Sequence, residues 1–183
     1  MMGHLPDPKH LGGVAIGAMI FTFIYWGFGF LRMGTGGLTA QALGRTDVDE
    51  VRACLARAAV IGIPVSVILI LLQIPIASLA FSILEASHDV ETLAQEYFLV
   101  RIWGAPATLM NFALLGWFIG CQNTKAALWH QLSLNGVNIV LDLVFVLGFN
   151  WDVTGVAAAT AIADGVAVIV GILLALPILR KLG

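Results

Sequence analysis

The sequence predicts an all-α fold, a polytopic transmembrane helix bundle with five spans. Of its 183 residues, 60% are hydrophobic and only 11% are charged, and the mean hydropathy is +0.96. Soluble domains carry about 25% charged residues, so this composition excludes a water-facing globule. Transmembrane strands would show short alternating segments, whereas the apolar runs here are long and continuous.

Three apolar runs contain no charged residue: they are 21, 27 and 23 residues long, at 11–31, 58–84 and 102–124. Each is long enough for a membrane-spanning helix, which needs about 20 residues. Two further runs are equally apolar, but each is interrupted once, by Asp142 and by Asp164. With their flanks, the predicted spans are 11–34, 58–84, 98–121, 126–148 and 153–179, in a single transmembrane domain over residues 1–183.

Local signals mark the ends and interruptions of these helices. The polar segment 44–57 predicts a turn that leads into a helix, with Asp47 or Asp49 as the N-cap. Pro64 and Pro106 interrupt long spans and predict bends, because proline removes a backbone hydrogen bond. Such bends either serve gating or are only structural.

Small residues at a spacing of four predict close helix contacts. Gly116 and Gly120 form a GxxxG pattern, as do Gly13 and Gly17. Such rows allow two helix backbones to approach closely in a membrane.

The charged residues predict the orientation in the membrane. Five spans place alternate loops on the same side, and cytoplasmic loops are enriched in Lys and Arg. We therefore expect a carboxyl end in the cytoplasm and an external amino end, in a bacterial inner membrane. Because no signal sequence precedes the first span, we also expect an amino-terminally shortened fragment that lacks a first helix. One side holds Arg45, Arg52, Arg57, Lys125, Arg180 and Lys181, and the other holds Lys9.

A polar stripe runs along the fourth predicted span. Gln131, Asn135, Asn138 and Asp142 lie at offsets of 0, 4, 7 and 11 residues, which places them on one helix face. A charged residue at mid-span costs about 2.5 to 3.5 kcal/mol on insertion scales. Asp142 is therefore a candidate for reversible protonation or for binding a cation.

Thr160 on the fifth span is the predicted partner of this carboxylate. The turn near Asn150 follows Asp142 by about eight residues and precedes Thr160 by about nine, so the two reach nearly equal depth on antiparallel helices. We therefore expect Asn138, Asp142 and Thr160 to share one site.

Other polar residues have both a functional and a structural explanation. Gln131 and Asn135 either line a cavity or only form interhelical hydrogen bonds. Asp164 either lines the cavity or is neutralised by Arg32 or Arg101. The candidates for lining a cavity are Asn135, Gln131, Asn111, Asp164 and Arg101.

Two residues near span ends have a simple structural explanation. Arg101 follows an acidic loop, so extension of its side chain to the external interface accounts for it. We expect an exposed imidazole at His130, near the cytoplasmic end of its span, and assign it no proton transfer.

Three segments resemble the multidrug and toxic compound extrusion (MATE) family, in its DinF-like branch. The resemblance implies a twelve-helix antiporter of two six-helix lobes, of which this chain covers about helices 2 to 6 of the amino-terminal lobe. It implies export of organic, often cationic compounds in exchange for H⁺ or Na⁺, with no other cofactor. The segments are FGFLRMGTGGLTAQALG at 28–44, RIWGAPATLMNFALLGWFIGCQNTKAAL at 101–128 and NGVNIVLDLVFVLGFNWDVTGVAAATAIA at 135–163.

The resemblance also implies an ion-coupling site at Asn138, Asp142 and Thr160, which serve as metal ligands only if the ion is Na⁺. The family's first-helix acid is absent from this chain, which favours H⁺. Asp164 departs from the family pattern, where we expect an uncharged polar residue. The second lobe is also absent, and alternating access needs two bundles, so we do not expect the lone lobe to transport its small organic substrate.

Two other membrane functions remain open. A lipid-linked oligosaccharide flippase would place more cationic residues in its cavity, where Arg32 and Arg101 are the candidates here. The chain is otherwise an inactive remnant or an assembly subunit that contacts membrane lipid. The sequence shows no nucleophile with a paired base, no metal motif at Cys54 or Cys121 and few basic residues, which argues against an enzyme and a nucleic-acid binder.

Overall fold

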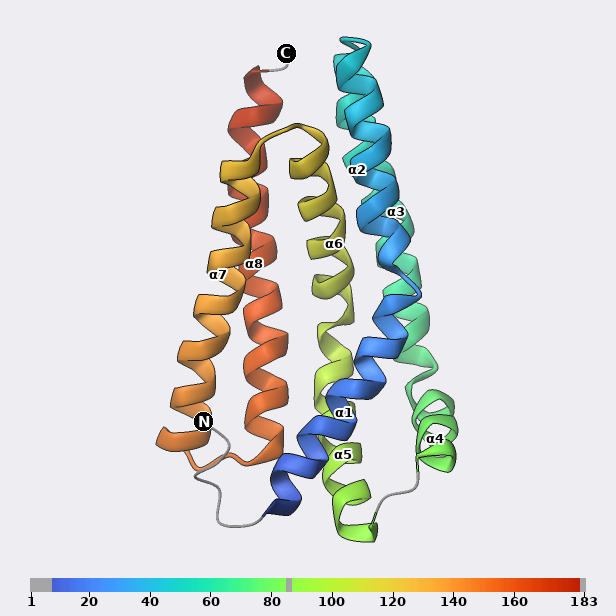
Figure 1. Cartoon of the computed structure of the whole chain (residues 1–183), viewed down its shortest axis with the longest axis vertical. Coiled ribbons are helices and arrows are strands. Elements are labelled where there is room, and N and C mark those ends of the chain that lie inside the picture. The colour runs from blue at the N-terminus through green and yellow to red at the C-terminus, as the bar shows by residue number, and fades with distance from the viewer. Residues whose placement is uncertain (1–7, 85–86, 182–183) are drawn as a thin grey trace.

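The computed structural model describes residues 8–84 and 87–181, which form an elongated bundle of helices (Figure 1). The long helices run roughly along the longest axis of the molecule. A 3₁₀ segment, η2, interrupts one long helical stretch, and a π-helical segment, η3, ends another. The elements are α1 (Pro8–Trp26), α2 (Gly29–Gly44), α3 (Val48–Leu71), α4 (Gln73–Ile83), α5 (His88–Arg101), η2 (Ile102–Gly104), α6 (Ala105–Gly120), α7 (Thr124–Asp142), η3 (Leu143–Gly148) and α8 (Val153–Lys181).

Five stretches of helix are long and apolar enough to cross a membrane, which confirms the predicted all-α bundle of five spans. The first of them combines α1 and α2, and the third combines α5, η2 and α6. They are Lys9–Gly44, Val48–Leu71, His88–Gly120, Thr124–Gly148 and Val153–Lys181.

The second span begins and ends earlier than the charge-free run 58–84. It begins at Val48, where the Asp47 carboxylate accepts a hydrogen bond from the Glu50 amide at 3.0 Å, so the predicted cap is confirmed. It ends at Leu71 because the ring of Pro75 clashes with a helical carbonyl four residues before it. Pro75 lies instead in the first turn of α4, where no helical amide partner is lost.

The two interior prolines have different surroundings. Pro106 lies in the first turn of α6, directly after the 3₁₀ segment η2 that separates α5 from α6. The predicted interruption of the third span is therefore present. Pro64 lies inside α3, which continues on both sides of it.

Helix α6 is at the centre of the packing. It contacts α2, α3 and α8, and its Leu114, Trp117 and Phe118 side chains are almost completely buried. The Trp117 indole Nε1 donates a hydrogen bond to the Val51 carbonyl at 2.8 Å, which ties α6 to the start of α3. A second core, nearer the opposite end, surrounds Phe98 of α5.

Glycines allow α2 and α6 to approach closely. A Cβ atom on Gly116 would lie 2.2 Å from the Arg32 carbonyl oxygen, and one on Gly120 would lie 2.6 Å from the Gly36 carbonyl oxygen. Neither position has room for a side chain. The close helix contact predicted from the Gly116 and Gly120 spacing is therefore present.

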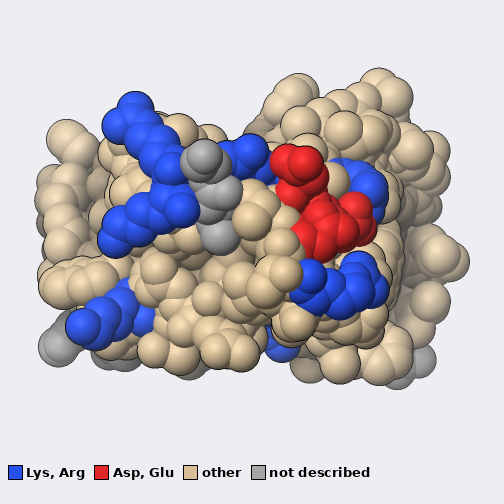
Figure 2. All heavy atoms as spheres, turned by 90° about the horizontal axis from the view of Figure 1, so that it is seen from above, with Lys and Arg blue, Asp and Glu red and all other residues tan. Residues whose placement is uncertain are grey.

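The basic residues of the alternate loops gather at one end of the bundle. The α2–α3 turn, the α6–α7 turn and the end of α8 all lie at the top of Figure 1. Figure 2 looks onto this end and shows several Lys and Arg side chains beside one acidic group. At the opposite end, Lys9 forms an ion pair with Asp89.

Candidate functional site

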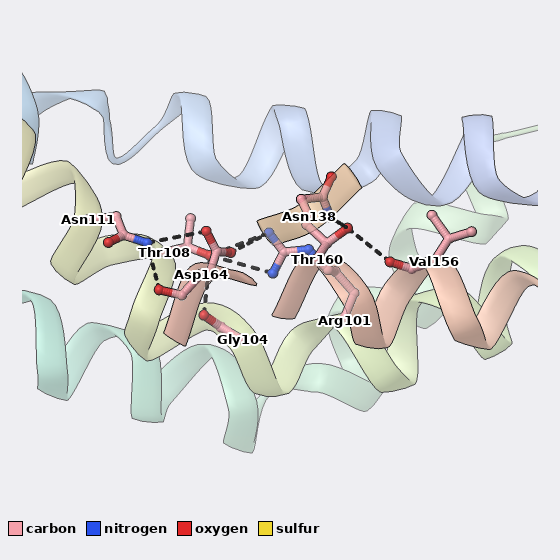
Figure 3. Close-up of polar contacts among 8 residues, drawn as sticks. All are labelled: Arg101, Gly104, Thr108, Asn111, Asn138, Val156, Thr160 and Asp164. Carbon is pink, nitrogen blue, oxygen red and sulfur yellow. Dashed lines mark hydrogen bonds and ion pairs between the residues drawn. The ribbon is translucent and has the colours of Figure 1, made fainter. Parts of the chain in front are cut away.

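Two of the three predicted ion-site residues are in contact. The Asn138 Nδ2 amide on α7 donates a hydrogen bond to the Thr160 hydroxyl on α8 at 3.2 Å (Figure 3). The Thr160 hydroxyl in turn donates to the Val156 carbonyl at 2.9 Å. The residue count places Asp142 at the depth of Thr160, whereas the observed contact of Thr160 is with Asn138, one helical turn earlier on α7.

Asp142, one turn after Asn138, ends α7 at the point where the π-helical segment η3 begins. Its Oδ1 oxygen is buried and has no hydrogen-bond partner among the described residues. An ionised oxygen in that situation is costly, because nothing replaces the water it has lost. The π-helix was not predicted, although such segments are frequent at functional sites.

Asp164, in contrast, has every carboxylate oxygen bonded. Its Oδ2 accepts from Arg101 Nη2 at 2.8 Å and from the Thr108 hydroxyl at 2.7 Å, and its Oδ1 accepts from Asn111 Nδ2 at 3.2 Å (Figure 3). The same Asn111 amide lies 3.0 Å from the Asp164 carbonyl. Arg101 and Asp164 are only 7% and 4% exposed. The sequence left Arg32 and Arg101 open as the neutralising partner, and the structure identifies Arg101.

This pairing corrects the simple explanation of Arg101. Its side chain does not extend to the external interface, because Asp164 on α8 holds the guanidinium inside the bundle. The aromatic rings of Phe21 and Tyr25 also face it, with Arg101 Cζ at 5.5 Å and 5.9 Å from their centroids.

His130 is a second correction. The imidazole is 1% exposed, not solvent-exposed, and its Nε2 lies 3.0 Å from the Asn111 Oδ1. Since the Asn111 amide nitrogen donates to Asp164, its oxygen must accept, which assigns the hydrogen to Nε2 of His130. The sequence signal for a buried His130 was the apolar Ala126, four residues earlier on the same face of α7, which is itself buried.

The other two residues of the polar stripe lie apart from this network. Gln131 is half-buried and Asn135 is exposed on α7. Neither forms a hydrogen bond with another residue that the structure describes.

A pocket of about 720 Å³ lies beside the ion-site pair. Thr160 belongs to both, since its side chain lines the pocket and contacts Asn138. Six of its fourteen described lining residues are aromatic, and none of them is acidic. The lining includes Phe21, Tyr25, Tyr97, Phe112, Arg101 and Arg32.

Within residues 8–84 and 87–181, no group of three or more His, Cys, Asp or Glu residues is arranged to hold a metal ion. Cys54 is buried and Cys121 is half-buried, and both are free thiols. Burial raises the pKa of the Cys121 thiol to about 11, so it stays protonated at neutral pH.

Comparison with known sequences identifies relatives over the whole chain. A sequence model of the family described as MatE matches residues 1–144. The DNA damage-inducible protein F of Escherichia coli (strain K12) is 37% identical over 183 residues, which are 100% of this chain and 40% of that protein. The multidrug export protein MepA of Staphylococcus aureus (strain NCTC 8325 / PS 47) is 24% identical over 163 residues, 89% of this chain and 36% of that protein.

Solved structures share the fold. An outward-facing conformation of a multidrug resistance MATE family transporter matches with a TM-score of 0.81 and 26% identity, covering 89% of this chain and 36% of that one. The corresponding inward-facing conformation matches with a TM-score of 0.76 and 25% identity, covering 90% and 38%. The chain therefore spans 40% or less of each of these relatives.

Proposed function

Because the chain belongs to the MATE family, whose members are transporters and not enzymes, we propose that it forms part of a secondary active multidrug exporter. The exporter exchanges organic, often cationic compounds for H⁺ or Na⁺. This chain is an integral membrane protein with five candidate spans and about 40% of the length of its E. coli relative. Transport is therefore assigned to an assembly that also contains a second lobe, since alternating access rocks one bundle against another.

The unpartnered oxygen of Asp142 carries this proposal. Two of the described carboxylates lie within the last two spans: both oxygens of Asp164 are bonded, whereas the buried Oδ1 of half-buried Asp142 has no partner. A bound cation would therefore remove the cost of this buried charge. Asp142 is thus the carboxylate that loads and releases the coupling ion, with Asn138 and Thr160 as neighbouring neutral oxygens.

The number of available oxygens favours H⁺ as this ion. Na⁺ would need several oxygen ligands, and this site offers the Asp142 carboxylate with the side-chain oxygens of Asn138 and Thr160. A proton needs only one carboxylate oxygen in a dry environment.

The aromatic pocket is the proposed site for the organic cation. Aromatic faces attract cations, and a volume of about 720 Å³ is within the usual range for small-molecule sites. The charge of Arg101 is balanced by Asp164, which leaves Arg32 as the uncompensated cation among the described lining residues. A flippase for lipid-linked oligosaccharides would need more cationic residues than the single uncompensated Arg32 supplies.

The proposal includes an orientation of the helix bundle in the membrane. The end of the bundle with the α2–α3 turn, the α6–α7 turn and the end of α8 faces the cytoplasm, since Arg45 and Lys125 lie in or beside these turns and basic residues favour that side. The amino end of the chain then lies outside, in a bacterial inner membrane.

Calorimetry on the purified chain tests the exchange of cation for proton. Binding of tetraphenylphosphonium, measured in two buffers of different ionisation enthalpy, should release up to about half a proton from Asp142 and should weaken as the pH falls. Asp142→Asn should abolish the proton release and reduce affinity by up to about tenfold at a pH where the wild-type carboxylate is ionised, because a charge attraction on the order of 1.5 kcal/mol is lost.

Asp49→Asn is the matched control, since that carboxylate is exposed at the basic end of the bundle. Asp49→Asn should change neither the proton release nor the affinity for tetraphenylphosphonium. Proton release that persists in Asp142→Asn would exclude this carboxylate. No binding of the cation by the wild-type chain would favour an inactive remnant or assembly subunit.

A further inference from the structure

A second concave surface lies between α3 and α8. It is a groove of about 580 Å³ with α3 and α8 as its walls and α6 as its floor. The side chains along it are aliphatic or Met, except at one end. They include Leu55, Ala59, Met110, Leu114, Ile172 and Leu176.

Two guanidinium groups stand at the basic end of this groove. Arg52 lies near the start of α3, and Arg180 lies in the last turn of α8. Arg52 Nη2 donates to the Leu179 carbonyl at 3.1 Å, which joins the two walls, and its Nη1 lies 3.7 Å from the exposed Asp49 carboxylate. Arg180 forms no ion pair with a residue that the structure describes. Each guanidinium has five N–H donors, so most remain available to an anion.

The groove has the dimensions of a lipid chain. Arg52 and Ala59 are seven helical steps apart, and Ile172 and Arg180 are eight, which corresponds to about 10 to 12 Å of helix. The hydrocarbon part of one leaflet is about 15 Å deep. The groove therefore extends from the charged end across most of one leaflet.

The charges at the end of the groove argue for a lipid over an apolar helix. An apolar helix would give the guanidinium groups of Arg52 and Arg180 no anion, whereas a phospholipid supplies a phosphate and an acyl chain. A soluble phosphate would use the two guanidinium groups and leave the apolar walls uncovered.

We propose that this groove binds one anionic phospholipid, with the phosphate at Arg52 and Arg180 and an acyl chain between α3 and α8. Basic pockets between membrane helices recognise acidic head groups in this way. The site is separate from the ion site, so it stands whether or not Asp142 exchanges protons.

Native mass spectrometry of the chain in detergent tests the proposal. Dioleoylphosphatidylglycerol should bind more tightly than dioleoylphosphatidylcholine. Arg180→Gln should weaken phosphatidylglycerol binding about fivefold, the usual effect of one basic residue near an anionic head group. Arg45→Gln, which removes the same charge from the same end but outside the groove, should leave it unchanged.

A substitution in the apolar wall tests the placement of the acyl chain. Ala56 lines the groove and is exposed, so Ala56→Phe should fill it without disturbing the fold, as circular dichroism would show. Phosphatidylglycerol binding should then fall by a similar factor. Unchanged binding in Ala56→Phe, equal losses in Arg45→Gln and Arg180→Gln, or equal competition by glycerol phosphate would each overturn the proposal.

Discussion

Replacing Asp164 with Asn alone is expected to lower the free energy of unfolding by about 3 to 5 kcal/mol, the usual cost of breaking a buried ion pair. The remaining Arg101 guanidinium would be buried beside Thr108 and two aromatic rings with no counter-charge. Unfolding of the chain in mixed micelles with increasing denaturing detergent would measure the change.

A double substitution distinguishes the lost charge balance from lost packing. Arg101→Met with Asp164→Leu replaces both charges by apolar groups of similar size, which is often neutral or stabilising. Thr108 would keep its bond to the Gly104 carbonyl, and Asn111 its bond to the carbonyl of residue 164. If the double variant is as unstable as Asp164→Asn, the ion pair is not the source of the effect.

This expected stability effect separates the roles of the two deep carboxylates. Asp164 is bonded by groups from α5 and α6, so its charge is compensated in the fold itself. Asp142 has an unpartnered oxygen next to a π-helical turn. We therefore expect loss of Asp164 to lower stability, whereas the proposed function assigns ion uptake to Asp142.

Features of the fold that depend on hydrophobic periodicity and on neighbours in the sequence could be predicted. Five apolar runs predict five spans, and counting residues from a shared turn predicts the contact of Thr160 with α7 to within about one helical turn. The Asp47 cap likewise depends only on neighbours in sequence.

Side-chain contacts that depend on the rotation of each helix about its axis could not be predicted from the sequence. Nothing local in the sequence decides whether Asp164 meets Arg32 or Arg101, because both are compatible with the span order. His130 differs from the neighbouring Gln131 by one helical step of about 100°, which buries one imidazole and leaves the amide half-exposed.

Replacing Gly116 with Ala is expected to lower the free energy of unfolding by about 2 to 3 kcal/mol. The new Cβ would lie 2.2 Å from the Arg32 carbonyl oxygen, which is main chain and cannot rotate away. Helices α2 and α6 would have to separate, and overpacking of this kind typically costs about 1 to 3 kcal/mol. Detergent unfolding measures the loss.

Gly37→Ala is the matched control, because it lies in α2 and a Cβ there meets nothing within 4 Å. Both substitutions gain about 1 kcal/mol of helix propensity when Gly becomes Ala. Because Gly37→Ala introduces no clash, its free energy of unfolding should be unchanged or higher. Since Arg32 also lines the aromatic pocket, a shifted α2 should weaken tetraphenylphosphonium binding in Gly116→Ala only. Equal stability of the two variants would mean that the bundle accommodates the methyl group, and that α2 and α6 are not held at this distance by their glycines.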